Sequence, residues 1–173
     1  MFIHVEQRRK PQPPWATIAV IAICAAMSVW STTLPGDERI ALLSRWGTVP
    51  AKLFDASVPL VQQLIELRWA RLITALFIHA DWLHLAGNLL FLMIFGLPAE
   101  RALGSWRFLF LFLLGGAAAN LVGASTLASA NAPIIGSSGA VSAIVGAYVA
   151  LFPRARLGLV LPLGLFLEFV RIP

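Results

Sequence analysis

Long apolar runs, separated by short segments that carry the charges, constrain this sequence more than any single motif. Hydrophobic residues make up 59% of the 173 residues and charged residues only 12%. A helix needs about 20 apolar residues to cross the hydrocarbon core of a bilayer, and several runs reach that length. The composition therefore predicts an all-α polytopic membrane bundle of about four spans plus a partial C-terminal segment, with no separate soluble domain.

Four spans are predicted from the apolar runs and the residues that flank them. They are expected at about Trp15 to Leu34, from Asp81-Trp82 to Pro98, from Trp106 to about Leu127, and from close to Ser138 to Phe152-Pro153. Asp81 is a candidate N-cap, because an aspartate side chain accepts hydrogen bonds from free N–H groups in a first helical turn. For Leu157 to Pro173 we expect an interfacial hairpin, with a fifth span as the alternative.

Basic residues between the apolar runs set the expected topology. Arg8-Arg9-Lys10 precedes the first span, and cytoplasmic segments of membrane proteins are enriched in Lys and Arg. We therefore expect a cytoplasmic stub at 1–14, a membrane domain at 15–173 and a large outer loop at about 35–80. A cleavable signal peptide is the competing interpretation, but the run is long for one and lacks a convincing cleavage site. The net charge of +5 is assigned to topology and lipid headgroups and not to nucleic acid.

The expected outer loop is too broken for a span and too apolar for a free loop. We predict short helices in the membrane plane, with Trp46 and Trp69 at headgroup depth. Residues 128–137 are too polar for a helix and are expected to dip inward as irregular chain, covered by protein or lining a wet cavity. A short start without a transit peptide favours a bacterial plasma membrane.

A serine inside a small-residue turn is the strongest chemical signal. Ser138 lies within Gly136-Ser137-Ser138-Gly139 and is expected at a helix start, where free backbone N–H groups could stabilise an oxyanion. His84 and Asn88 are four residues apart and share one helical face. Singly, each has a structural explanation, because serines bond to carbonyls one turn back and buried His or Asn side chains tie helices together. Together they favour acyl-transfer chemistry.

Several motifs occur in an order shared with a known family. They are Trp46-Gly47-Thr48-Val49-Pro50, Trp69-Ala70-Arg71-Leu72-Ile73-Thr74, His79-Ala80-Asp81-Trp82-Leu83-His84-Leu85-Ala86-Gly87-Asn88, Gly96, Glu100-Arg101, Gly104 and Gly136-Ser137-Ser138-Gly139. In this order they resemble the rhomboid intramembrane serine proteases, and the resemblance covers most of the chain from Trp46 to Pro173.

The resemblance implies a role for each matching residue. Ser138 is implied to be the nucleophile that attacks a peptide carbonyl, while His84 and Asn88 line the oxyanion hole together with the Ser138 N–H. Gly136 and Gly139 are implied to keep the backbone close to the bound peptide. Three further residues are given a structural role in holding the first loop: His79, Trp69 and Arg71.

Two departures from the family pattern affect the expected chemistry. The family's base is a histidine on a sixth helix, whereas the histidines here are His4, His79 and His84, all before Ser138. The ending resembles the entry to the family's fifth helix, so we expect either a chain cut at that point or an incomplete sequence. Ser142 stands where family members commonly carry an aromatic residue that packs on the base.

The resemblance implies an intramembrane serine endopeptidase that acts on transmembrane protein substrates in the bilayer, with no cofactor and no metal. A non-catalytic rhomboid-like protein that binds transmembrane helices is the alternative, and a transporter or channel fragment is weaker because the polar residues cluster at one outer site. A small-residue stripe of Gly139, Ala143 and Ala147, with Gly146 beside it, is expected to face lipid or a neighbouring chain and predicts self-association.

Overall fold

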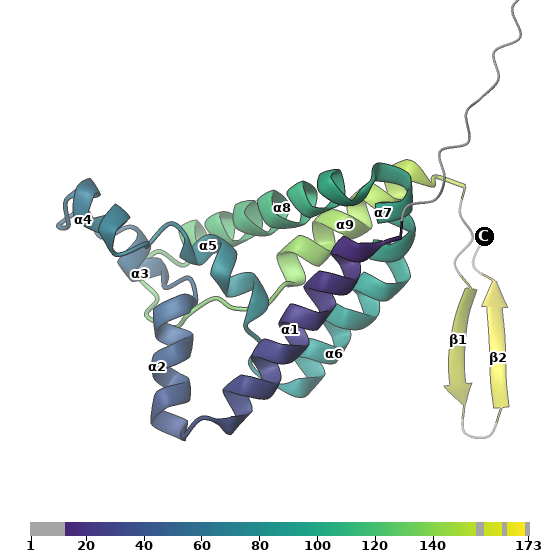
Figure 1. Cartoon of the computed structure of the whole chain (residues 1–173), viewed down its shortest axis with the longest axis horizontal. Helices are drawn as coiled ribbons and strands as arrows, with labels where there is room; N and C mark the ends of the chain where they lie inside the picture. The colour runs from purple at the N-terminus through teal and green to yellow at the C-terminus, as the bar shows by residue number, and fades with distance from the viewer. Residues whose placement is uncertain (1–12, 155–157, 164–165, 172–173) are drawn as a thin grey trace, which may run out of the picture.

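A bundle of long helices and a cluster of short ones make up most of the chain (Figure 1). The computed structural model describes residues 13–154, 158–163 and 166–171, so the expected stub at 1–14 lies mostly outside the described residues. The bundle contains α1 (Trp15–Thr33), α6 (Trp82–Phe91), the π-helix η2 (Leu92–Gly96), α7 (Leu97–Leu103), α8 (Ser105–Thr126) and α9 (Ser138–Leu151). The short helices are α2 (Gly36–Trp46), α3 (Pro50–Leu53), α4 (Leu60–Ile65), α5 (Arg71–Thr74) and the 3-10 helix η1 (Ala75–Phe77).

Among the described residues, three continuous helical segments are long and apolar enough to cross a bilayer: Trp15–Thr33, Trp82–Leu103 and Ser105–Thr126. The predicted helical membrane bundle is therefore confirmed, and the first and third spans end within one residue of their expected positions. The fourth, α9, is apolar but has only 14 residues. At about 1.5 Å per residue it is roughly 21 Å long, less than the bilayer's apolar thickness of about 30 Å.

The second span is longer than predicted, and its end at Pro98 was wrong. Helix continues through this proline to Leu103, because a π-helical turn, Leu92–Gly96, directly precedes it. Proline lacks an N–H and its ring crowds the preceding turn, which a wider π-turn accommodates. The extra length carries Glu100 into the bundle.

Glu100 closes the exposed start of α1. Helix α1 follows Pro14 and has no side-chain cap of its own. The buried Glu100 carboxylate instead accepts hydrogen bonds from the N–H groups of Ala16, at 2.9 Å, and Thr17, at 2.7 Å. A carboxylate at a helix N-terminus satisfies free N–H groups and complements the helix dipole. This contact fixes α1 against α7.

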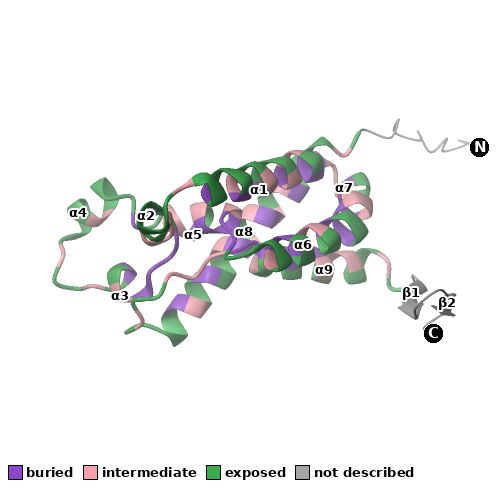
Figure 2. Ribbon diagram, turned by 90° about the horizontal axis from the view of Figure 1, so that it is seen from below, coloured by how far each residue is buried: buried purple, intermediate pink, exposed green. Residues whose placement is uncertain are grey.

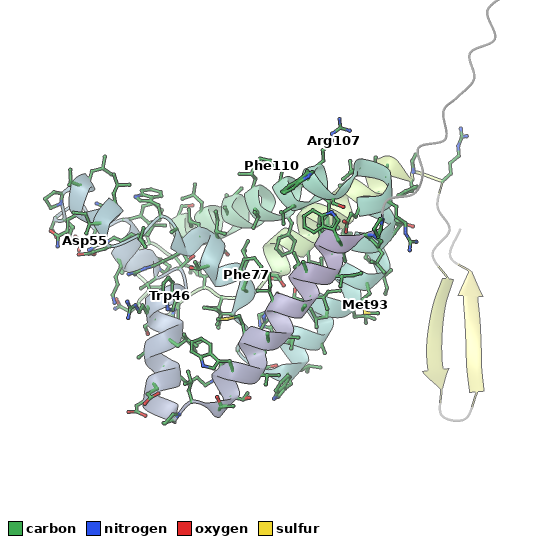
Figure 3. The ribbon with its side chains drawn as sticks, viewed as in Figure 1. Trp46, Asp55, Phe77, Met93, Arg107 and Phe110 are labelled. Carbon is green, nitrogen blue, oxygen red and sulfur yellow. The ribbon has the colours of Figure 1, made fainter. Side chains whose placement is uncertain are left out.

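The apolar core lies where the long helices meet. Figure 2 shows buried residues along the facing sides of the bundle and exposed ones on its outer surface. Phe108 and Phe112 of α8 are fully buried, whereas Phe110 on the same helix is 65% exposed. Met93 is 54% exposed, and Figure 3 shows both of these exposed side chains. The outward apolar side chains form a surface suited to lipid.

Small residues bring α8 and α9 into close contact. A Cβ added at Gly115 would lie 2.5 Å from the Cβ of Ala143, and one added at Gly116 would lie 2.9 Å from that of Ala140. Gly139 meets Ala119 in the same way. The expectation that the Gly139, Ala143 and Ala147 stripe faces lipid or another chain was wrong for Gly139 and Ala143, which pack against α8 within this chain. Self-association through Ala147 stays a prediction.

The segment before α6 forms short helices, as predicted, and is fastened to the bundle. The Asn120 side chain of α8 donates a buried hydrogen bond to the Leu72 carbonyl at 2.9 Å. The carbonyl of Trp46 accepts a hydrogen bond from the Thr74 hydroxyl at 2.7 Å, which joins the end of α2 to α5. This segment is therefore a folded part of the domain.

After Pro153 the described residues form strands β1 (Gly158–Leu163) and β2 (Phe166–Arg171), which pair antiparallel with Gly158 opposite Arg171. They give the expected hairpin, here made of strands, and lie to one side of the helical bundle (Figure 1). Apart from this hairpin, the fold is helical.

Candidate active site

A tight turn positions the start of α9. Gly136 has φ +107°, a conformation that favours glycine, and its N–H donates a hydrogen bond to the Ala75 carbonyl at 2.9 Å. Ser137 follows at the N-cap position and is fully buried. Ser138 then opens the helix and is exposed, so its hydroxyl is accessible and its N–H belongs to the free first turn.

The first turn of α6 approaches this turn from the side. Asp81 is the N-cap, as predicted, and its carboxylate accepts a hydrogen bond from the His84 N–H at 2.8 Å. The His84 ring lies directly against Gly136, since a Cβ added there would be 2.5 Å from the imidazole Cε1. Asn88 is 6% exposed and donates from its amide to the His84 carbonyl at 2.9 Å. The closeness of α6 and α9 therefore depends on a glycine at 136.

A groove of about 330 Å³ runs between these two helices. From α6 it is lined by Leu83, His84, Gly87, Asn88 and Phe91, and from α9 by Ser138, Val141 and Ser142. The three residues that the sequence singled out for chemistry thus share one groove, with apolar side chains around them. Such a site suits a polypeptide segment that presents one polar bond among apolar side chains.

Ser142 lies one turn beyond Ser138 in the groove. Its hydroxyl donates to the Ser138 carbonyl at 2.9 Å, the usual bond of a helical serine to the preceding turn. Because this side chain is small and turned back toward its own helix, it leaves the space beside Ser138 open.

His79 contacts the residue before the predicted nucleophile. Its Nε2 lies 3.2 Å from the Ser137 hydroxyl, and its ring stacks edge-on against His84 with 5.2 Å between centroids. Burial, reinforced by His84, lowers the pKa of His79 to about 4, so its imidazole is neutral at pH 7. Sequence reasoning did not identify Ser137 as the partner of His79, because nothing in two adjacent serines of a turn indicates which one is buried.

The loop expected to be held by Trp69 and Arg71 is fastened mainly through other groups. Thr48 pairs with Ile134 through two backbone hydrogen bonds of 3.0 and 2.8 Å, which joins the loop to the chain just before the turn. The Thr48 hydroxyl donates to the Arg71 carbonyl at 2.9 Å, while Trp69 is 38% exposed. Residues 128–137 form no helix, as predicted, and supply Ile134 to this contact.

No metal site accompanies this groove in the part of the chain that the structure describes: no three His, Cys, Asp or Glu side chains are grouped closely enough to hold an ion. The sequence also matches the model of a known protein family. The Rhomboid domain model matches residues 66–171, which include both walls of the groove. The chain belongs to the rhomboid family.

Relatives in this family differ in the activity that their names state. RHOMBOID-like protein 5 of Arabidopsis thaliana is 31% identical, across 80% of this chain and 52% of its own length. Rhomboid protease GluP of Bacillus subtilis is 38% identical, across 50% of this chain and 17% of its own. Inactive rhomboid protein 1 of Drosophila melanogaster is 36% identical, across 47% of this chain and 6% of its own.

This rhomboid chain spans about half or less of the length of the curated relatives that it matches. No solved structure matches it significantly. The relatives include one named as a protease and one named as inactive, so membership in the family does not by itself establish catalysis.

Proposed function

We propose that this protein is an intramembrane serine endopeptidase that cleaves transmembrane segments of other membrane proteins, with Ser138 as the nucleophile. The observation that carries the proposal is the groove itself, because an exposed serine at a helix start shares it with His84 and Asn88. The apolar side chains that line it suit a transmembrane substrate, and the three apolar helices of bilayer-spanning length support a site within a bilayer.

In this proposal the Ser138 oxygen attacks the carbonyl carbon of the scissile bond, and negative charge develops on the carbonyl oxygen. The Ser138 N–H at the start of α9, with the side chains of His84 and Asn88, would stabilise this oxyanion. Collapse of the tetrahedral intermediate breaks the C–N bond, the proton given up by Ser138 passes to the leaving amine, and a serine ester remains. Water then attacks this ester, which releases the carboxylic acid and restores the Ser138 hydroxyl. The implied role of Gly136 and Gly139 beside the peptide is replaced by contacts within the chain, because the missing Cβ of Gly136 makes room for the His84 ring and that of Gly139 makes room for Ala119 of α8.

The proton of Ser138 must pass to a base. No hydrogen bond between a histidine and Ser138 is found among the described residues, since His79 contacts Ser137 and the His84 ring packs on Gly136. This observation favours a second candidate function, a non-catalytic rhomboid-like protein that binds transmembrane helices in the same groove.

The orientation and extent of the domain complete the proposal. The start of α1, the α7–α8 turn and the end of α9 lie at one end of the bundle (Figure 1), where Arg101, Arg107 and Arg154 add positive charge. We place this end and the stub at 1–14 in the cytoplasm, the rhomboid-like domain at 15–173, and the loop at 35–80 on the outer side. Relatives from a plant, a bacterium and an insect give no preference for a bacterial plasma membrane.

Labelling with a membrane-impermeant maleimide tests this orientation in intact cells. Both replaced side chains are exposed in the structure, and the native Cys24 is buried. We expect Lys52→Cys to react from outside and Arg107→Cys to react only after permeabilisation. The reverse pattern would invert the topology and place the groove at the cytoplasmic side.

Cleavage of a single-span protein in proteoliposomes tests the function. Ser138→Ala should lower turnover by roughly a thousandfold or more, as loss of a catalytic serine does, and should abolish labelling by a fluorophosphonate. Ser142→Ala is the matched control on the same helix and should retain both. If the wild-type protein shows neither cleavage nor labelling but binds the span, and Ser138→Ala binds it equally well, the non-catalytic function holds.

A further inference from the structure

A second polar pocket, separate from the groove, lies between the end of α2 and the segment that leads into α5. It has a volume of about 190 Å³, and two guanidinium groups line it, those of Arg45 and Arg71. Trp46, Ile65 and Leu67 supply apolar walls. We call it the Arg45–Arg71 pocket; the proposed protease chemistry makes no use of it.

Arg45 and Arg71 have no ion-pair partner in the part of the chain that the structure describes. The Nε of Arg71 is buried and has no hydrogen-bond partner there. Arg45 lies over the Trp46 ring, 5.5 Å from its centroid. Burial most of all, then the nearby Arg68 charge and to a lesser extent that of Arg45, lower the pKa of Arg71, while Glu66 acts in the opposite direction.

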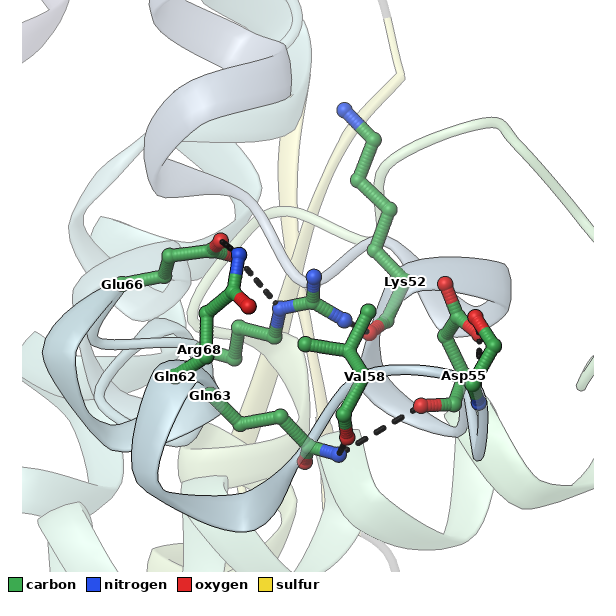
Figure 4. A network of polar contacts seen from close by, with 8 residues as sticks. Lys52, Asp55, Val58, Gln62, Gln63, Glu66 and Arg68 are labelled. Carbon is green, nitrogen blue, oxygen red and sulfur yellow. Dashed lines mark hydrogen bonds and ion pairs between the residues drawn. The ribbon is translucent and has the colours of Figure 1, made fainter.

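Glu66 is the acidic residue of this pocket, and its carboxylate is already engaged. One oxygen accepts from Arg68 Nε at 2.7 Å and the other from the Gln62 amide at 3.0 Å, as Figure 4 shows. Arg68 also donates to the Lys52 carbonyl at 2.6 Å. Since Arg68 balances Glu66, Arg45 and Arg71 remain as two unpaired cations facing one cavity.

The surroundings of the pocket indicate where its ligand comes from. Exposed apolar side chains follow it along and just after α4: Leu64 is 56% exposed, Ile65 75% and Leu67 56%. Trp46 and Trp69 are 37% and 38% exposed, and tryptophan prefers the headgroup depth of a bilayer. Cations beside exposed apolar groups at this depth match an amphipathic ligand better than a free ion.

We propose that the Arg45–Arg71 pocket binds the phosphate of an anionic phospholipid, whose acyl chains lie along the exposed apolar side chains of α4. Guanidinium groups bind phosphate through paired charge-assisted hydrogen bonds. Arg45 and Arg71 both line the cavity, and the buried Nε of Arg71 has no hydrogen-bond partner among the described residues. The bound lipid holds the α2 end and the α4–α5 segment together at the bilayer surface.

Lipid binding to the purified full chain in detergent micelles tests this proposal, with native mass spectrometry as the readout. Phosphatidylglycerol is the probe, and phosphatidylcholine and inorganic phosphate are the comparisons. Arg45→Gln and Arg71→Gln should each weaken phosphatidylglycerol binding about fivefold, the effect of one basic residue at an anionic membrane surface. Arg107→Gln removes the same charge from the start of α8 and should bind like the wild type.

Three results would overturn the proposal. Equal binding by all four proteins would show that the pocket is not the site, and equal binding of phosphatidylcholine would remove the anionic preference. Displacement of the lipid by equimolar inorganic phosphate would assign the pocket to a free anion. Arg45 is exposed at the end of α2, so Arg45→Gln keeps the test valid if Arg71→Gln fails to fold.

Discussion

Replacement of Gly136 by alanine tests the geometry on which the groove depends. The new Cβ would lie 2.5 Å from Cε1 and 2.7 Å from Nε2 of the His84 ring, far inside contact distance. The backbone also has φ +107° there, a conformation that L-residues rarely adopt. Alanine at this position therefore meets two separate penalties, one from the backbone and one from the imidazole.

The two penalties have different sizes and can be separated. Strain from a side chain at positive φ costs about 1–2 kcal/mol, and forcing a methyl group into a packed contact costs about 1–3 kcal/mol more. We expect Gly136→Ala to lower the free energy of unfolding by about 2–5 kcal/mol. In a His84→Ala background only the backbone part, about 1–2 kcal/mol, should remain.

Unfolding by SDS in mixed dodecyl maltoside micelles, followed by helical circular dichroism, measures these free energies as a double-mutant cycle. Gly146→Ala on the same helix is the control: nothing lies within 4 Å of its added Cβ, so it should stabilise by about 0.5–1 kcal/mol. A Gly136→Ala cost that is identical with and without the His84 ring would refute the contact between α6 and the turn.

Three further predictions concern other contacts, each measured by the same unfolding assay. Glu100→Gln should lower the free energy of unfolding by about 1.5–3 kcal/mol, because charge-assisted hydrogen bonds to α1 are lost. Glu38→Gln, at an exposed position, is the control and should change this free energy by less than about 0.5 kcal/mol. Ala143→Leu should lower the free energy of unfolding by about 1–3 kcal/mol, because the larger side chain overpacks the contact with α8. Ala150→Leu, at an exposed position of the same helix, should change it little. Equal effects of the two variants would contradict the contact between α8 and α9. The pKa of His79 is lowered to about 4 in the folded protein, against about 6.5 in the unfolded chain, so the unfolded chain binds this proton first as the pH falls. The contribution of neutral His79 to the free energy of unfolding is therefore complete above about pH 6.5 and declines toward pH 4. His79→Gln should lack this part of the decline.

Local chemistry in the sequence was enough to place several features. Asp81 caps its helix because a short acceptor precedes an apolar run, and α9 starts at Ser138 because turn residues end there. The shared face of His84 and Asn88 follows from helical periodicity alone. Features of this kind depend on residues within about one helical turn, so they can be predicted from the local sequence.

Features that depend on a partner far along the chain were not predictable in the same way. Pro98 predicted a helix end, and only the π-turn before it explains why the helix continues. Gly139 and Ala143 predicted a close contact correctly but could not name α8 as the partner. Likewise, the sequence alone did not predict that the Ser137 hydroxyl contacts His79 while Ser138 lines the groove.

The pairing of Thr48 with Ile134 has a consequence for biogenesis. Thr48 is synthesised well before Ile134, with α6 and α8 between them in the sequence. The backbone N–H and carbonyl of Thr48 therefore lack these hydrogen-bond partners until the segment before α9 has been synthesised. Contacts of such high sequence separation form late, because the long intervening loop must close first. The turn that carries Ser138 therefore assembles only after α8 has been made, and the groove between α6 and α9 is incomplete in a shorter nascent chain.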